Sequence, residues 1–179
     1  MSEFNTTIFL IFNSLVGRST TLDLAIIFFA DYLAYVLVAA SIVSLILWRK
    51  MLVEKVRAFL VALIAVAVSH VVFVELIRLF YVHPRPFSAL SGVHNLLTET
   101  GSSFPSGHAT LFFALSAFMY RCNRRLGGIF FVLSGTMGIA RVSAGVHYPL
   151  DILGGAIMGI LVGFVSYRVV DKFLPKSVI

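Results

Sequence analysis

Residues 136–155 read TMGIARVSAGVHYPLDILGG and join two long apolar runs, each of which we predict to be a helix. The junction contains a fixed cation, an imidazole and a carboxylate, which are Arg141, His147 and Asp151. Ionisable groups are costly within an apolar region and usually serve a function there. Pro149 is suited to the first turn of the second helix. Chemically, the three side chains supply a nucleophile, an acid that orients it and a cation that holds an oxyanion.

The whole chain shares this apolar character. It has 179 residues, of which 59% are hydrophobic and 12% charged, with a mean hydropathy of +0.98. This composition excludes an ordinary soluble protein and predicts a single membrane-embedded domain, residues 1–179, built as an all-α polytopic bundle. The net charge of +6 comes from short clusters at the ends of apolar runs, so we predict no nucleic-acid partner. A single cysteine, Cys122, excludes an internal disulfide and a Cys-rich metal site.

We predict about five transmembrane helices and one N-terminal interfacial helix. The expected spans are residues 22–47, 56–80, 106–120, 126–142 and 149–170. Residues 1–20 are amphipathic, too short to span, and lack the basic start of a signal peptide, so we expect them to be retained at the interface. The third and fourth spans reach only roughly 22–26 Å, less than a bilayer core of about 30 Å. Their ends with His108 and Arg141 should therefore be recessed.

Small residues indicate where the last span packs. Gly155, Gly159 and Gly163 recur at every fourth position, which permits close approach of another helix. We expect Gly135 and Gly138 on the preceding span to form the facing groove.

The basic residues predict the orientation in the membrane. Ten of the fourteen fall within 49–57, 121–125 and 168–176. With five spans, these stretches share one side, and an excess of Lys and Arg marks it as cytoplasmic. We therefore expect the loop at 83–104 and the polar motifs to face the extracytoplasmic side.

Two earlier stretches bring further anion-binding groups to that side. Residues 105–108, PSGH, begin an apolar run, so their side chains lie where the free amides of a helix N-terminus hold an anion. Arg78 and Arg85, in the pattern Arg-x6-Arg-Pro, end another run. Guanidinium is the side-chain group best suited to bidentate contact with phosphate.

The three polar stretches, residues 78–86, 105–108 and 140–151, are called the three blocks below. In this order and spacing they resemble the signature of the type 2 phosphatidic acid phosphatase superfamily. It includes membrane lipid phosphatases and, more distantly, vanadium haloperoxidases. The resemblance extends from Arg78 to Asp151. Two positions depart from the pattern: Arg78 stands where the family has Lys, and Ala140 stands where it has Ser. Arg78 keeps the charge, and no role is assigned to Ala140.

The resemblance implies a two-step reaction at phosphorus. His147 is the implied nucleophile, Asp151 orients it, and His108 protonates the leaving oxygen before activating the water that hydrolyses a phosphohistidine. The residues implied to bind phosphate are Arg78, Arg85, Ser106, Gly107 and Arg141. No metal ion or other cofactor is implied, because three guanidiniums supply the positive charge and no carboxylate cluster is present to hold a cation.

Other polar residues within the spans have structural interpretations. Glu75 lies one turn before Arg78 and is expected to pair with it. Asp31 and His70 are expected to be hydrogen-bonded within the bundle, with a catalytic role as the alternative for each.

The connection at 83–104 is the one long loop, and long loops in compact domains are usually functional. Its apolar side chains either dip into the interface and guide a lipid tail or are simply buried. His83 and His94 match no family position, and no role is assigned to them.

The leading hypothesis is a phosphatase of a bacterial cytoplasmic membrane that converts undecaprenyl diphosphate to undecaprenyl phosphate, with its site facing the periplasm. The alternative within the class is a phosphatase for phosphatidylglycerophosphate or a lipid A phosphate. Two alternatives come from other classes. A lipid transporter or flippase is expected to have internal repeats, and the sequence shows none. A vanadium haloperoxidase is expected to be soluble, unlike this apolar chain. A further alternative is that the motif residues have only structural roles, as anchors at the membrane interface and as polar contacts within the bundle. The oligomeric state and the lipid are left open.

Overall fold

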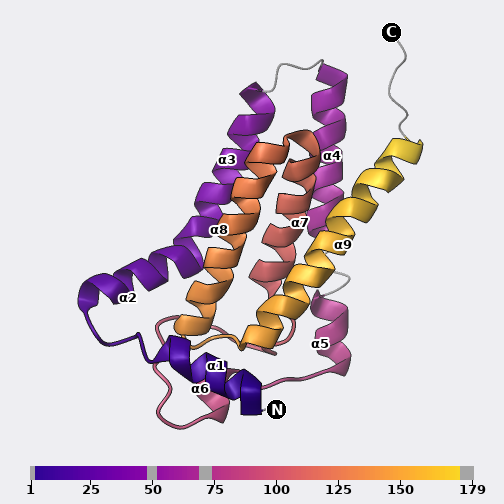
Figure 1. Ribbon diagram of the computed structural model, residues 1–179. Coiled ribbons are helices and arrows are strands. Elements are labelled where there is room, and N and C mark those ends of the chain that lie inside the picture. Colours follow the sequence, from indigo (N-terminus) through magenta and orange to yellow (C-terminus); the bar gives the residue numbers. More distant parts are fainter. Residues whose placement is uncertain (1–2, 48–51, 69–73, 174–179) are drawn as a thin grey trace.

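The computed structural model describes residues 3–47, 52–68 and 74–173, and within them it contains helices and no strand (Figure 1). The predicted all-α helical class is confirmed. The helices are α1 Glu3–Asn13, α2 Thr20–Ile27, α3 Leu33–Leu47, α4 Leu52–Ala67, α5 Leu76–Phe80, α6 Pro86–Ala89, α7 Gly107–Cys122, α8 Arg124–Ser143 and α9 Pro149–Phe173, with a π-helical turn, Phe28–Tyr32, joining α2 to α3. His70, residues 49–51 and Lys176 lie outside the described residues.

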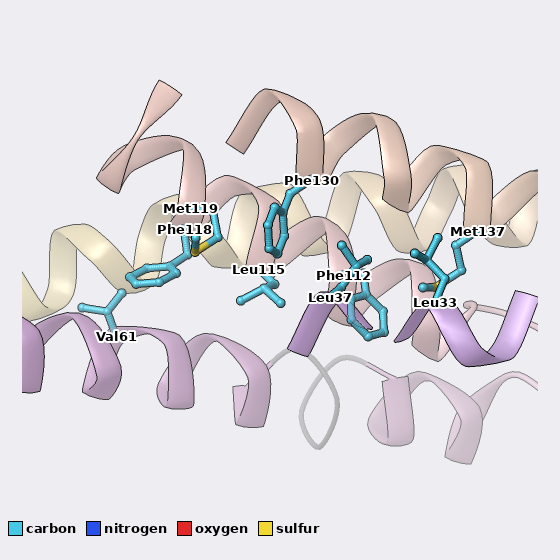
Figure 2. Packing of buried hydrophobic residues seen from close by; sticks show 9 residues of the cluster. All are labelled: Leu33, Leu37, Val61, Phe112, Leu115, Phe118, Met119, Phe130 and Met137. Atoms are coloured by element: carbon cyan, nitrogen blue, oxygen red, sulfur yellow. The ribbon is translucent and has the colours of Figure 1, made fainter. Parts of the chain in front are cut away.

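Helix α7 is the centre of the bundle and packs against both α8 and α9. Figure 2 shows its side chains meeting those of α3, α4 and α8 in one apolar cluster. The buried members are Leu33, Leu37, Val61, Phe112, Leu115, Phe118, Met119, Phe130 and Met137. Lipid tails are as apolar as these side chains, so close packing rather than transfer from water holds the helices together. This core fixes the positions of the helix ends that carry the motifs.

The glycine stripe of α9 packs on α7. A Cβ at Gly159 would lie 2.2 Å from the carbonyl oxygen of Thr110, and one at Gly163 would lie 2.7 Å from that of Ala114. The predicted close contact is therefore present, but the partner expected for it was wrong. Gly135 faces open space and Gly138 faces Ile152, whereas α7 offers the small residues that allow the two backbones to meet.

Helix caps set the bounds of the central hairpin. Ser106 caps α7, and Asn123 accepts hydrogen bonds from the amides of Arg125 and Leu126, so α8 begins at Arg124. The predicted spans at 106–120 and 126–142 therefore correspond to α7 and α8, extended by capped turns.

Three helical stretches of the described chain are long and apolar enough to span a membrane: Thr20–Leu47, Arg124–Ser143 and Pro149–Ser166. Their outer faces expose large apolar side chains such as Leu24, Ile129 and Leu161, as expected of a lipid-facing surface. The predicted span at 56–80 includes residues outside the described chain, and α7 has only 16 residues. The count of five spans therefore stays a prediction.

The first span is not one continuous α-helix. The π-helical turn at Phe28–Tyr32 separates α2 from α3, and α2 leaves the direction of the bundle in Figure 1. The Arg141 guanidinium donates to the Ala30 carbonyl there, at 3.1 Å. A side chain that bonds into the helical ladder is a common cause of such bends. Asp31 lies in the same turn and interacts electrostatically with Arg141.

Helix α1 packs across the ends of α8 and α9 (Figure 1). Its buried face consists of Asn5, Phe9 and Asn13. The Asn13 amide donates to the carbonyls of His94 and Ser143, and Asn5 accepts from the Leu150 amide. The helix thus satisfies backbone groups beside the candidate site, and its interfacial position stays a prediction.

Candidate active site

The three sequence blocks meet at one end of the bundle, where α7 and α9 begin and α8 ends (Figure 1). The α7–α8 turn lies at the opposite end, so the basic stretch at 121–125 is far from the motifs. A cavity of about 340 Å³ occupies the site. Its lining residues are Arg78, Arg85, Glu99, Thr100, Gly107, His108, Leu111, Phe112, Arg141 and His147. Six of the eight predicted site residues therefore share one cavity; of the other two, Ser106 is the N-cap residue of α7 and Asp151 contacts His147.

His147 lies in the five-residue connection between α8 and α9 and is 1% exposed. Gly145 shapes this connection, because its φ is +86° and an added Cβ would lie 2.3 Å from the His94 carbonyl oxygen. The Nε2 atom of His147 is 3.4 Å from Nη1 of Arg85. Burial lowers the pKa of His147 to about 4, although Asp151 opposes the shift. The ring is therefore neutral near pH 7, as a nucleophile must be.

Asp151 lies in the first turn of α9, and its carboxylate faces the other nitrogen of His147. Oδ2 is 3.6 Å from Nδ1 of His147 and accepts a 2.7 Å hydrogen bond from the Tyr148 amide. The proton of the imidazole belongs on the nitrogen that faces the carboxylate, which leaves the Nε2 lone pair directed to the cavity. The (i, i+4) spacing across a helix start thus places the carboxylate beside the imidazole, and the orienting role of Asp151 stays a prediction.

Ser103 is a site residue that sequence reasoning missed. Its hydroxyl donates to Oδ2 of Asp151 at 2.5 Å and lies 3.5 Å from Nδ1 of His147, and the residue is fully buried. It therefore positions the carboxylate against the imidazole. Nothing in the sequence distinguishes it from Ser102, its neighbour in the loop.

Arg85 is 3% exposed, and the loop that follows it wraps around its guanidinium. Its nitrogens donate to the carbonyls of Gly101, Val146 and Thr100 at 3.0–3.2 Å. Burial lowers the pKa of Arg85, and Glu99 opposes that shift. These contacts fix one cation beside Nε2 of His147.

Arg141 and Arg78 complete the cationic lining. Arg141 is 1% exposed and donates to Ala30 and to the Glu99 carboxylate. Arg78 donates to the Pro105 carbonyl at 3.2 Å and to Glu75 at 3.4 Å, so the predicted Glu75 pair is confirmed. Within the described part of the chain, the Nε atoms of both arginines are buried and have no hydrogen-bond acceptor. Buried donors of this kind are costly unless a ligand satisfies them, so both are suited to an oxyanion.

The start of α7 forms another wall of the cavity. Gly107 and His108 line it, and the His108 ring stacks on Phe112 with centroids 6.3 Å apart. Ser106 is fully buried, and its hydroxyl accepts from the Ala109 amide as the helix cap. Ser106 is absent from the residues that line this cavity, so its predicted contact with phosphate stays a prediction.

The two histidines without a sequence-based role differ in position. Nδ1 of His83 lies 3.9 Å from Oδ1 of Asp151, and its ring packs against Tyr81 and Tyr148. It therefore lies behind the orienting carboxylate, which the family pattern gave no reason to expect. His94 pairs through its backbone with Asn13 of α1, away from the cavity.

Among the described residues, no group of three His, Cys, Asp or Glu side chains is arranged to hold a metal ion. The cavity instead brings together three guanidiniums, one carboxylate and two imidazoles. Such a lining can bind a tetrahedral oxyanion, present a neutral imidazole to its central atom and supply a second imidazole for proton transfer.

Comparison with known proteins places these residues in a family context. The family model of the PAP2 superfamily matches residues 55–175, which include all three blocks. The chain is 32% identical to the undecaprenyl-diphosphatase BcrC of Bacillus subtilis, over 96% of this chain and 86% of that protein. It is 30% identical to a bacitracin transport permease protein BcrC of Bacillus licheniformis, over 89% of this chain and 77% of that protein.

A solved structure is similar in fold. The crystal structure of LpxE from Aquifex aeolicus superposes with a TM-score of 0.77 at 30% identity, covering 93% of this chain and 96% of that one. The arrangement of helices described above is therefore shared over nearly the whole length of both chains.

Proposed function

Because the chain belongs to the PAP2 superfamily and is a phosphoric ester hydrolase, we propose that it removes the terminal phosphate of undecaprenyl diphosphate through a phosphohistidine at His147. The observation that carries the proposal is the environment of His147. Its neutral ring has Asp151 at one nitrogen and the arginine-lined cavity at the other.

The first step transfers the phosphoryl group. Nε2 of His147 attacks the terminal phosphorus, and the bond from phosphorus to the bridging oxygen breaks as His108 gives that oxygen a proton. Asp151 stabilises the positive charge that develops on the imidazole. Undecaprenyl phosphate then leaves.

The second step hydrolyses the intermediate. His108, now neutral, takes a proton from water, whose oxygen attacks phosphorus and breaks the bond to Nε2. Orthophosphate is released, and both imidazoles return to their starting states. In each step the guanidiniums of Arg78, Arg85 and Arg141 neutralise the equatorial oxygens, which is the main contribution a protein makes to phosphoryl transfer.

The lipid is proposed from the cavity walls and the relatives. Leu111 and Phe112 line the cavity beside the cationic groups, so an apolar chain attached to the phosphate has an apolar wall to follow. Among the described residues that line the cavity, Glu99 supplies the one carboxylate, and it is already paired with arginines. A compact diphosphate on a hydrocarbon chain suits this lining better than a glycerol headgroup with several hydroxyls. The undecaprenyl-diphosphatase relative supports the same assignment.

The test is a comparison of substrates in one detergent. We expect kcat/KM for undecaprenyl diphosphate to exceed that for phosphatidylglycerophosphate and for a lipid A phosphate. Equal or higher kcat/KM for either alternative assigns the enzyme to that substrate instead. His147→Ala serves as the inactive control and shows that released phosphate comes from this site.

The permease relative makes transport the second candidate. A transporter moves its cargo unchanged and needs a membrane that separates two compartments. A hydrolase releases orthophosphate even in detergent micelles, which have no such compartments. Phosphate release by the purified protein in micelles therefore separates the candidates, and its absence with all three lipids would favour transport.

A further inference from the structure

Glu99 places a carboxylate inside the cationic cavity. Its Oε1 accepts from Nη2 of Arg141, and its Oε2 lies 3.4 Å from Nη2 of Arg85. It lines the same cavity as His147 and is 26% exposed. Two of the three guanidiniums assigned to phosphate are therefore already bound to an anion of the protein itself.

This carboxylate is charged at neutral pH. Burial raises the pKa of Glu99, but Arg141 and then Arg85 lower it by more, so the balance lies below the usual value of 4.5. The three guanidiniums and Glu99 together give the cavity a formal charge of +2, whereas the arginines alone would give +3.

A carboxylate and a phosphate compete for the same donors, because each presents two oxygens to the fork of a guanidinium. In the resting protein, the two oxygens of Glu99 contact guanidinium nitrogens of Arg141 and Arg85 that phosphate oxygens could otherwise use. The buried Nε atoms of Arg78 and Arg141 have no acceptor among the residues that the structure describes. Glu99 therefore satisfies only part of the donor set, and a phosphoryl group with three free oxygens can satisfy more of it.

The backbone next to Glu99 is held in place. The carbonyls of Thr100 and Gly101 accept from Arg85 at 3.1 and 3.2 Å, so these contacts need not break for the glutamate side chain to leave the cavity. Because that side chain is partly exposed, rotation about its own bonds takes the carboxylate into solvent.

We infer that Glu99 is a tethered competitor of phosphate: it occupies the phosphate subsite in the resting enzyme, yields it to the terminal phosphate of the lipid, and returns as orthophosphate leaves. The inference rests on the proposed function, since it assigns the same cavity to phosphate. It makes Glu99 a specificity-determining residue that weakens the binding of small anions and speeds product release. A substrate overcomes the competition because its lipid chain holds the diphosphate at the site.

The experiment measures binding of inorganic orthovanadate and inorganic phosphate to the purified full-length protein by calorimetry, without any lipid substrate. Glu99→Gln keeps the size of the side chain and removes its charge. Glu75→Gln is the matched control, because it removes the same charge from a glutamate that is 54% exposed and pairs with Arg78. Two charge-assisted contacts compete with the ligand, so we expect Glu99→Gln to lower the Kd for both anions by about tenfold or more. Glu75→Gln should change it by less than about threefold.

The outcomes are distinct. Tighter anion binding by Glu99→Gln supports the inference, because a merely structural role would weaken binding when the charge is removed. Unchanged or weaker binding, with normal binding by the wild type, overturns the inference and leaves the proposed function intact. If neither wild type nor variant binds either anion, the oxyanion site itself is refuted, and the inference fails with it.

Discussion

Replacing Gly159 by Ala tests how the fold holds the catalytic groups together. The added Cβ would lie 2.2 Å from the Thr110 carbonyl oxygen and 2.9 Å from the Ala114 amide nitrogen, both backbone atoms of α7. An ordinary contact between carbon and oxygen is about 3.3 Å or longer, so α7 and α9 must separate by about 1 Å. Neither atom belongs to a side chain that could rotate away.

The energetic cost follows from that separation. Overpacking lowers the free energy of unfolding by about 1–3 kcal/mol, and the higher helix propensity of Ala offsets up to about 1 kcal/mol of that loss. The net loss is therefore about 0–3 kcal/mol, which lowers Tm by up to roughly 12 °C in a chain of this size. The same separation affects the site, because the Ser106 amide of the α7 cap donates to the Asp151 carbonyl of α9 at 3.1 Å. A misplacement of about 1 Å reduces kcat by up to about 100-fold.

The assay is thermal unfolding of the purified protein in detergent, followed by intrinsic fluorescence, together with kcat for phosphate release. Gly135→Ala is the control, because a Cβ there meets no atom of the described residues within 4 Å. It should leave kcat unchanged and keep or slightly raise Tm. If Gly159→Ala matches Gly135→Ala in both measurements, the reasoning about the α7–α9 contact is refuted.

Three further predictions concern the site and its orientation. Ser103→Ala removes the hydroxyl that holds Asp151 and should lower kcat about five- to tenfold with little change in KM, the loss of roughly one hydrogen bond; a rise in KM alone would argue against a positioning role. Turnover should persist in excess EDTA, because guanidiniums rather than a bridging cation neutralise the phosphate, and strict dependence on added magnesium would contradict this. With Cys122 replaced, a cysteine placed within 88–100 should react with an impermeant thiol reagent in intact cells, whereas one within 121–125 should not; the reverse labelling would invert the topology.

The sequence predicted the parts of the site that depend on helix geometry. His147 and Asp151 are spaced (i, i+4) across a helix start, and residues 105–108 precede another, so the meeting of antiparallel helices brings the blocks together. The pair of Glu75 and Arg78 follows from the same periodicity, at one helical turn.

The sequence was less informative where the chain is irregular. Ser103 lies in a loop without periodicity, and only the path of that loop brings its hydroxyl to Asp151. Glu99 does have a signature in the sequence: it and Arg85, with which it pairs, are the two fully charged residues of the loop at 83–104. Opposite charges isolated in one apolar loop predict a contact.

Packing partners and bends were also beyond the sequence. The stripe of α9 predicted a close helix contact, but several spans carry small residues, and only the structure selects Thr110 and Ala114 of α7 over Gly135 of α8. The carbonyl of Ala30 in the π-helical turn of the first span accepts a hydrogen bond from the Arg141 side chain, which lies more than 100 positions away in the sequence.

The central claim is that His147 carries the phosphoryl group during turnover. The most direct measurement is a rapid quench of the enzyme with undecaprenyl diphosphate labelled in its terminal phosphate, followed by identification of the labelled peptide. We predict acid-labile label on His147 that forms before orthophosphate appears, disappears as orthophosphate is released, and persists longer in His108→Ala because the activation of water is lost. Label on another residue, or full turnover by His147→Ala, would contradict the account.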